Sequence, residues 1–353
     1  MSVHPMPSAI HRNMWYSVLC YIGLWVTWAF ASWETHLTDR RSVINAMSFD
    51  IEDWFHLLGP DALPDVRLWQ DQPSLVTRYT ERILEILGEH GVRATFFVLG
   101  WIADRYPQIA GRIASNGHEL GTHSYWHRPV HQLTRREFRE DLIRSIAVLE
   151  QQTGQKVRGF RAPGFSITPE QSWAFDIMLD LGLEYDASLI PFGLRQGMGY
   201  PCCQGPHVLR DCPSGRGIAE LPASVMQIGP YGLRFSGGGY LRLLPASVIR
   251  WCGRKHNSRG MPFVVYLHPR DLATDQPLAT VSLKRQFLSC VGLSSTERKL
   301  RMLCTEFRFE TCVRVLAMHK LSHAAASTEH SEPNSIEPSV SLPAPLAAGL
   351  SHQ

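Results

Sequence analysis

The sequence predicts an α/β fold in which parallel strands are joined by helical crossovers. Short apolar segments alternate with amphipathic segments from residue 42 to about residue 270, an order that is typical of parallel sheets. Polar side chains also follow several of the apolar segments. The strand ends of a parallel barrel meet at one face, where active sites are built, so these side chains are expected to lie close together.

The individual elements follow from spacing and capping signals. Segment 74–91 has apolar residues at helical spacing and ends at a glycine, and segment 134–154 opens with a capping box of Thr134 and Glu137. Thr168 before Pro169 indicates a further helix start. Strands are expected over residues 42–49, 92–100, 118–123, 157–164, 183–189 and 262–269, and helices over residues 74–91, 103–117, 134–154, 168–182, 245–257 and 296–320.

Composition divides the chain into three parts. Residues 1–41 are expected to be a hydrophobic extension, 42–320 the folded domain, and 321–353, rich in Ser, Ala, Pro and His, a disordered tail. Within the domain, the Gly- and Pro-rich segment 192–245 is interpreted as an insertion or irregular strands.

The N-terminal extension leaves the localisation open. Its uncharged stretch 14–33 is about as long as a membrane-spanning helix, and "AFA" at 29–31 resembles a signal-peptide cleavage site. A membrane anchor, a signal peptide and an upstream extension outside the fold are all retained as alternatives. The location is accordingly cytoplasmic, membrane-associated or exported.

Bulk composition excludes one class of partner. A net charge of +3 gives no electrostatic case for binding nucleic acid. The eight cysteines have no CxxC or zinc-ribbon spacing. Ordinary thiols and a local disulfide among Cys202, Cys203 and Cys212 both stay open.

An acid cluster and a histidine pair predict a metal site. Asp50, Glu52 and Asp53 follow the first strand, and His123 and His127 are spaced so that both imidazoles can reach one ion. One carboxylate and two imidazoles form the ligand set of a catalytic zinc site, beside which a second carboxylate would act as general base. Strand alternation favours Glu52 as the ligand, whereas a turn after Asp50 would bring Asp53 inward; Asp53 is slightly preferred.

Three further candidates follow later strands. Arg161 ends a strand in "RAPG", where the turn at Gly164 presents backbone N–H groups, and Asp186 lies in "YDAS". His268 follows a fully apolar strand in "YLHP". A separate histidine with a carboxylate partner would serve as general acid. Each candidate also has a purely structural interpretation as a surface arginine, a turn aspartate or a packed histidine.

Taken as an ordered set, these motifs resemble a known family. "SFDIED", "HSYWH", "RAPG", "YDAS" and "YLHP" resemble the five motifs of the NodB-homology polysaccharide deacetylases, carbohydrate esterase family 4, and residues 94–124 are also typical of them. "SFDIEDWF" and residues 236–245 and 266–277 resemble the exosortase-associated branch in particular. The resemblance covers roughly residues 42–318.

The resemblance implies a fold, a cofactor and a reaction. It implies a distorted (β/α) barrel of about seven parallel strands and a divalent metal, usually Zn²⁺, with Co²⁺ as an alternative. It also implies removal of N-acetyl groups from an amino-sugar polysaccharide, as in exopolysaccharide biosynthesis. The implied roles are Asp50 as base, His123 and His127 as metal ligands, Arg161 as the residue that orients the base, His268 as acid, Asp186 as the partner of the acid, and the N–H near Gly164 as oxyanion donor.

Departures from the family pattern keep alternatives in view. The family's usual pair of adjacent aspartates is replaced by "DIED" at 50–53. The aromatic residue that usually follows the proline of the third motif is replaced by "GF". The "HPWE" of the exosortase-associated branch is replaced by "HPRD". A metal-independent cyclic-amide hydrolase of the allantoinase type is opposed by Asp50 and by the histidine pair. A non-catalytic glycan-binding protein is opposed by the complete set of acid, base and ligands.

Overall fold

A curled, mostly parallel sheet forms the centre of the molecule. The computed structural model describes residues 43–56, 58, 65–191, 200, 203–228, 231–277 and 289–319. Within these residues the main sheet has nine strands in the order β10-β1-β2-β3-β4-β5-β7-β6, with β11 paired to β1 beside that path. All its pairs are parallel except β6 with β7. The expected α/β barrel is confirmed as an open half-barrel.

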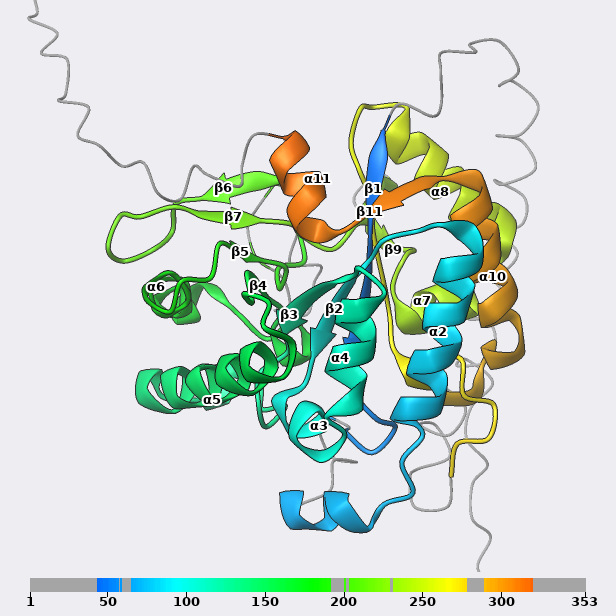
Figure 1. Ribbon diagram of the computed structural model, residues 1–353. Helices are drawn as coiled ribbons and strands as arrows, with labels where there is room; N and C mark the ends of the chain where they lie inside the picture. The colour runs from blue at the N-terminus through cyan, green and yellow to red at the C-terminus, as the bar shows by residue number, and fades with distance from the viewer. Residues whose placement is uncertain are drawn as a thin grey trace, which may run out of the picture.

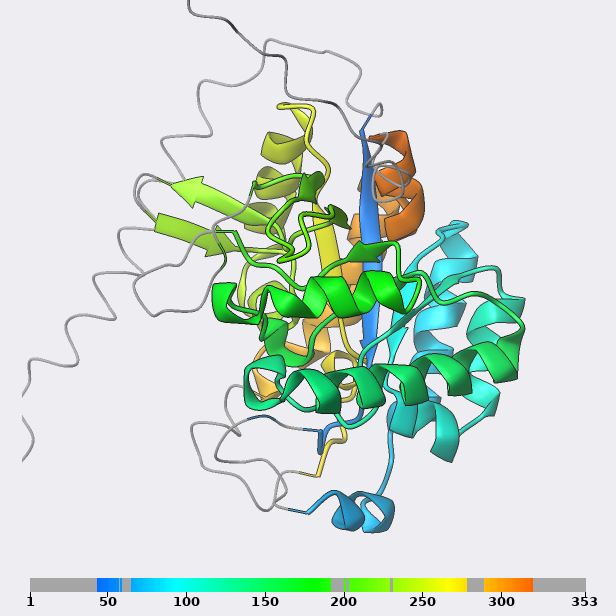
Figure 2. The ribbon, with the colours of Figure 1, turned by 90° about the vertical axis from the view of Figure 1, so that its left-hand side faces the viewer.

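The strands are short, and the longest of them, β1, lies between β10 and β2 near one end of the strand order (Figure 1). They are β1 Ile44–Ile51, β2 Thr95–Val98, β3 Glu119–Thr122, β4 Gly159–Phe160, β5 Tyr185–Asp186, β6 His207–Leu209, β7 Ile218–Glu220, β8 Val225–Ile228, β9 Tyr231–Arg234, β10 Val264–Leu267 and β11 Arg308–Glu310. Strands β8 and β9 form a separate antiparallel hairpin that extends away from the main sheet (Figure 2).

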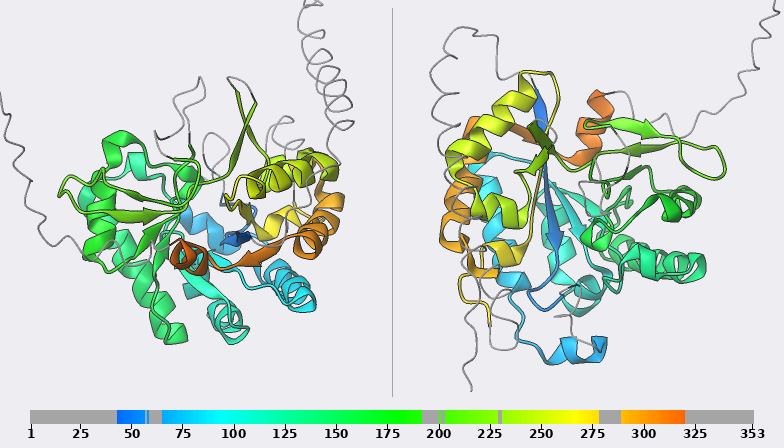
Figure 3. Two further views of the ribbon diagram at one scale, coloured as in Figure 1. Left: turned by 90° about the horizontal axis from the view of Figure 1, so that it is seen from above. Right: turned by 180° about the vertical axis from the view of Figure 1, so that it is seen from behind.

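Helices form the outer layer around the strands (Figure 3). They are α2 Val76–His90, α3 Gly100–Arg105, α4 Gln108–Ser115, α5 Arg135–Thr153, α6 Trp173–Asp180, α7 Gly238–Leu243, α8 Ala246–Asn257, α10 Leu293–Glu306 and α11 Cys312–Met318. Single turns of 3₁₀ helix lie at Val66–Asp71, Val130–Gln132, Pro163–Phe165, Pro169–Gln171 and Pro269–Asp271.

Capping signals read from the sequence are found in two of the helices. Thr134 accepts a hydrogen bond from the backbone N–H of Glu137, whose side chain accepts one in return, as a capping box does. Helix α2 ends at Gly91, which adopts a left-handed φ of 62° that costs glycine little. Both helices turn apolar side chains toward the outer face of the sheet.

Alternation along β1 determines which side chains enter the barrel. Met47, Phe49 and Ile51 join the main hydrophobic core. Ala46 belongs to a second cluster that fills the barrel interior, and Asp50 lies on the same side of the strand because side chains alternate along it. The C-terminal end of β1 therefore delivers a carboxylate to the interior.

Several expected elements differ from the structure. The expected helix 103–117 is two helices, because Pro107 lacks an N–H and disfavours helical backbone before it. The expected helix 296–320 is interrupted by β11, whose backbone pairs with β1. Helix α6 begins at Trp173, after a 3₁₀ turn that starts at Pro169. The segment 192–245 contains α7 as well as strands.

Other expectations lie wholly or partly outside the described residues. The stretch 14–33 and the tail from 321 are both outside them. No helix in the described ranges is long and apolar enough to cross a membrane. Cys202 and Cys20 are also outside, whereas Cys203 and Cys212 are free thiols.

Candidate metal centre and active site

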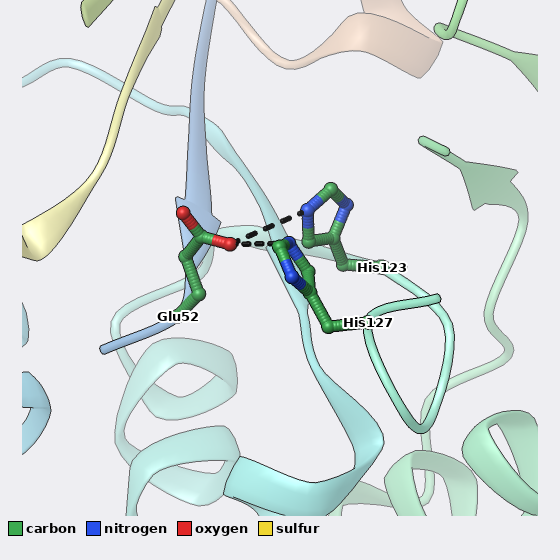
Figure 4. Close-up of side chains that lie close together, drawn as sticks. All are labelled: Glu52, His123 and His127. Carbon is green, nitrogen blue, oxygen red and sulfur yellow. Dashed lines mark ion pairs between the residues drawn. The ribbon is translucent and has the colours of Figure 1, made fainter. Parts of the chain in front are cut away.

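Glu52, His123 and His127 come together at the carboxyl ends of the strands. Their ligand atoms lie within 4.8 Å of one another, and all three residues are buried. Oε2 of Glu52 faces Nε2 of both imidazoles, in close contact with His127 and at 4.0 Å from His123 (Figure 4). Glu52 follows β1 and the histidines follow β3, two strands that are separated in the sheet by β2 alone.

The loop that carries the two histidines is held in an unusual conformation. Ser124 and His127 have left-handed φ values of 68° and 53°, which non-glycine residues seldom adopt outside functional sites. Asp141 of α5 accepts hydrogen bonds from the backbone N–H groups of Tyr125 at 2.7 Å and Trp126 at 3.0 Å. Helix α5 thereby fixes the turn that points both imidazoles at Glu52.

The protonation of the cluster suits a cation. Nδ1 of His123 lies 2.8 Å from the backbone carbonyl of Arg161, which can only accept a hydrogen bond, so Nδ1 carries the proton. Nε2 is then unprotonated, and its lone pair can bind a metal ion. Burial lowers the pKa of His123 to about 4. Burial would raise the pKa of Glu52, but His127 and Arg270 outweigh it and hold that pKa well below its usual range. The site thus offers a carboxylate and a neutral imidazole.

The donor set fits a divalent transition metal. Oε2 of Glu52 is buried and has no hydrogen-bond partner of good geometry among the described residues. One carboxylate and two imidazoles match the ligands of catalytic zinc sites, which leave a position for water. Oε1 of the same carboxylate is held by Nη2 of Arg270 at 3.0 Å, so the side chain is oriented with Oε2 toward the imidazoles.

Asp53 faces away from this cluster. Its carboxylate accepts hydrogen bonds from the Ser74 hydroxyl at 2.5 Å and from the backbone N–H groups of Leu75 at 3.0 Å and Val76 at 3.2 Å. These groups belong to the start of α2, so Asp53 acts as a structural cap. The expected inward turn of Asp53 is not found, and Glu52 is the acid that lies with the histidines.

Asp50 and Arg161 form a buried ion pair beside the cluster. Nη1 of Arg161 lies 2.8 Å from Oδ1 of Asp50 and 2.9 Å from Oγ of Ser48, and its Nε donates to the Ala187 carbonyl at 3.1 Å. The guanidinium also stacks on Phe97, 4.3 Å from the ring centroid. Asp50 is thus locked in one orientation with Oδ2 left toward the site, in agreement with the expected pairing.

His268 follows β10 and lies at the side of the site away from the two histidines of the cluster. Strand β10 pairs with β1, and Nε2 of His268 lies 3.8 Å from Oδ2 of Asp50 and 3.6 Å from Oε1 of Glu52. Its Nδ1 lies 2.9 Å from Oδ2 of Asp271. Burial and Arg270 would lower the pKa of His268, but the hydrogen-bonded carboxylate of Asp271 and the charge of Glu52 together outweigh them and raise it.

Asp186 is not the partner of His268. Its carboxylate accepts hydrogen bonds from Oγ of Ser188 at 2.5 Å and from the backbone N–H of Ser188 at 3.2 Å. Oγ of Ser188 in turn accepts from the backbone N–H of Ala162. Asp186 therefore supports the loop that holds Arg161, and Asp271 is the carboxylate beside His268 because it is only three residues away on the same turn.

Gly164 and two arginines complete the surroundings. Gly164 has a φ of 63°, and a Cβ there would lie 2.6 Å from the Leu58 side chain, so the turn after Arg161 needs glycine. Its role as oxyanion donor stays a prediction. Arg270 stands in the sequence only as part of the "HPRD" departure from the family pattern, and no sequence motif marked Arg242. The His-Pro-Arg-Asp spacing, which is that of a capping box, was a usable signal for Asp271.

Comparisons with known proteins find similarity to two families in two regions of the chain. Residues 66–185 match the family model "Polysaccharide deacetylase", and residues 187–317 match "Domain of unknown function (DUF3473)". A peptidoglycan-N-acetylglucosamine deacetylase of Bacillus cereus is 36% identical over 118 residues, which are 33% of this chain and 42% of that protein. This chain therefore matches less than half of that relative's length.

Solved structures share the fold. A crystal structure from Mycobacterium smegmatis, assigned as a polysaccharide deacetylase, covers 82% of this chain and 92% of its own at a TM-score of 0.53 and 20% identity. Puue allantoinase covers 82% and 94% at a TM-score of 0.55 and 14% identity. Because one fold is common to both, the reaction has to be argued from the site.

These matches show where the similarities lie along the chain. Residues 66–185 are similar to polysaccharide deacetylases, and residues 187–317 are similar to DUF3473 domains, so each match covers only part of the described fold.

Proposed function

We propose that this protein is a metal-dependent hydrolase that removes N-acetyl groups from an amino-sugar polysaccharide. The observation that carries the proposal is the buried cluster of Glu52, His123 and His127 beside the Asp50–Arg161 ion pair. We propose these three residues as metal ligands, Zn²⁺ as the cation and Co²⁺ as a substitute. When bound there, a divalent cation would polarise the acetamide carbonyl and acidify a water molecule.

The side chains around the cluster can supply the two proton transfers. Asp50, fixed by Arg161, accepts a proton from the attacking water through Oδ2. The water oxygen bonds to the carbonyl carbon, and the carbon–nitrogen bond breaks. His268 donates a proton from Nε2 to the departing nitrogen, which leaves as a free amine while acetate is released. A backbone N–H at Gly164 is proposed to bind the oxyanion.

We also propose a biological setting for this activity. Residues 236–245 and 266–277 resemble the exosortase-associated branch, which supports a role in exopolysaccharide biosynthesis. Membrane association through residues 14–33 is proposed on composition alone.

Acetate release tests the reaction. The purified protein is treated with chelator, its residual metal is measured, and a panel of N-acetylhexosamine polymers is assayed before and after Zn²⁺ or Co²⁺ is restored. Chelation should abolish acetate release and the cation should restore it. Asp50→Asn should keep the cation and lower turnover by about 10²-fold or more. Equal activity without metal, or turnover of allantoin in place of the polymers, would contradict the proposal.

A matched variant separates loss of the base from general damage. Asp65→Asn removes an exposed carboxylate that pairs only with the exposed Arg67 among the described residues. It should behave as the wild type in both metal content and acetate release. Glycan binding with no acetate released over the whole panel would instead favour a binding protein.

A further inference from the structure

Behind His268 lies a second ion pair, which connects it to Arg242. Nε of Arg242 lies 3.0 Å from Oδ1 of Asp271. Oδ2 of the same carboxylate accepts hydrogen bonds from the His268 backbone N–H at 2.9 Å and contacts Nδ1 at 2.9 Å. Only 10% of the Arg242 side chain and 3% of the Asp271 side chain are exposed. One carboxylate oxygen thus faces the histidine, and the other forms an ion pair with the arginine that lacks the geometry of a hydrogen bond at Nε.

Arg242 is itself held in place by the chain around it. Its Nη1 donates to the Ser289 carbonyl at 2.5 Å. The ammonium of Lys299 on α10 donates to the Leu241 carbonyl at 2.9 Å and to the Arg242 carbonyl at 2.7 Å. Helix α10 therefore fixes the end of α7, and with it the base of the Arg242 side chain.

The start of α7 packs directly on the same pair. A Cβ on Gly238 would lie 3.0 Å from Oδ2 of Asp271 and 3.3 Å from Nδ1 of His268. Glycine allows this close approach, so the stretch "SGGGYLRLLP" wraps around the histidine and its carboxylate. The glycine and the arginine of this stretch contact the same carboxyl group.

The charges explain why Arg242 matters for the orientation of the Asp271 carboxylate. Asp271 is buried, and a buried carboxylate without a partner for one oxygen is costly. With Arg242 removed, Oδ1 would lose its cation, and the carboxylate would turn toward other donors or toward solvent. His268 would then lose the acceptor that fixes the plane of its ring. The neighbouring Arg270 points at Glu52 and does not replace this contact.

We propose that Arg242 is a positioning residue for the general acid: it fixes Asp271 so that the His268 imidazole keeps Nδ1 on that carboxylate and turns Nε2 toward the departing nitrogen. The inference rests on the proposed deacetylase function. It also assigns a task to the DUF3473 region, which supplies the acid, its carboxylate partner and the arginine that holds both.

The test compares leaving groups. Expulsion of an amine needs a proton from the acid, whereas 4-nitrophenolate departs as a stable anion. Arg242→Met should therefore lower acetate release from an N-acetylated chitooligosaccharide by about 10²-fold and change hydrolysis of 4-nitrophenyl acetate only a few-fold. Asp271→Asn should show the same selectivity, and Arg242→Lys should recover part of the loss. Arg250→Met removes a more exposed ion pair, to Glu306, away from the site and should change neither rate.

A spectroscopic readout is independent of turnover. In ¹⁵N-histidine-labelled protein, the His268 signal, identified by its loss in His268→Gln, should report a strongly hydrogen-bonded Nδ1–H in the wild type and a weaker hydrogen bond at Nδ1 in Arg242→Met. If no polymer yields acetate, the proposed function fails while this signal still decides the positioning role. The inference would be overturned if Arg242→Met lowered the hydrolysis rates of both substrates by the same factor. It would also be overturned if the variant kept the wild-type ratio of the two rates and an unchanged His268 signal.

Discussion

The two acids that follow Asp50 have opposite surroundings, and this separates their roles. Glu52 faces the imidazoles, whereas Asp53 caps α2. Glu52→Gln should weaken cation binding by at least roughly 10–100-fold. That is the loss of affinity seen when a residue that only supports a metal ligand is removed, and Glu52 is proposed as a ligand itself. Asp53→Asn should keep the cation and lower the free energy of unfolding by about 1 kcal/mol, since it weakens a helix cap. Metal content after dialysis and urea unfolding measure these effects, and the reverse pattern would identify Asp53 as the ligand.

Residue roles were predictable only where local sequence determines them. The positions of Asp50, His123, His127 and Arg161 could be read from motifs at strand ends. The choice between Glu52 and Asp53 depends on how the chain turns after β1, where the Glu52 N–H bonds to the Asp50 carbonyl at 3.0 Å. That turn is set by contacts with α2, some twenty residues further along the chain, and no local pattern encodes it.

At the scale of elements, helix α11 closes the amino-terminal end of the barrel. Its buried side chains join the interior cluster formed by strands β1, β2, β5, β7 and β10, and its first N–H, that of Cys312, bonds to Oγ1 of Thr95 at 2.7 Å. The sequence indicated one helix over 296–320. It could not show the break, because β11 is stabilised by pairing with β1 and by packing of Phe309 on Phe263, contacts between segments far apart in the chain.

This closure predicts a difference between two positions on one helix. Leu316 is 1% exposed in the interior cluster, whereas Met318 is 49% exposed. Leu316→Ala should lower the free energy of unfolding by about 2–4 kcal/mol through lost burial and a cavity, and Met318→Ala by less than about 0.5 kcal/mol. Urea unfolding of the metal-free proteins measures both. Equal effects would show that α11 does not contribute to the core.

For the whole molecule, the candidate site is assembled from three parts of the chain. Strand β1, which supplies Asp50 and leads into Glu52, lies before both family matches. The deacetylase match contributes His123, His127 and Arg161, and the DUF3473 match contributes His268 through β10, which pairs with β1. Neither matched region therefore holds all the residues of the candidate site.

The stability of the whole fold should fall in mild acid because of imidazoles buried in the neutral form. His256 on α8 is fully buried beside Phe235, and burial lowers its pKa from an ordinary value of 6.5 to about 4. Between these values the unfolded chain binds a proton that the folded chain does not. The free energy of unfolding therefore decreases as the pH falls from about 6.5 toward 4, by about 2 kcal/mol at pH 4.5 for this one group.

His256→Phe isolates that contribution. Other groups also titrate in this range, so the quantity to measure is the change in unfolding free energy between pH 7 and pH 4.5, in chelator, for the wild type and for the variant. The variant should lose about 2 kcal/mol less than the wild type, because sites that do not touch His256 contribute equally to both and cancel. An identical loss in the two proteins would mean that His256 is already protonated in the folded state, and that its burial does not hold the imidazole neutral.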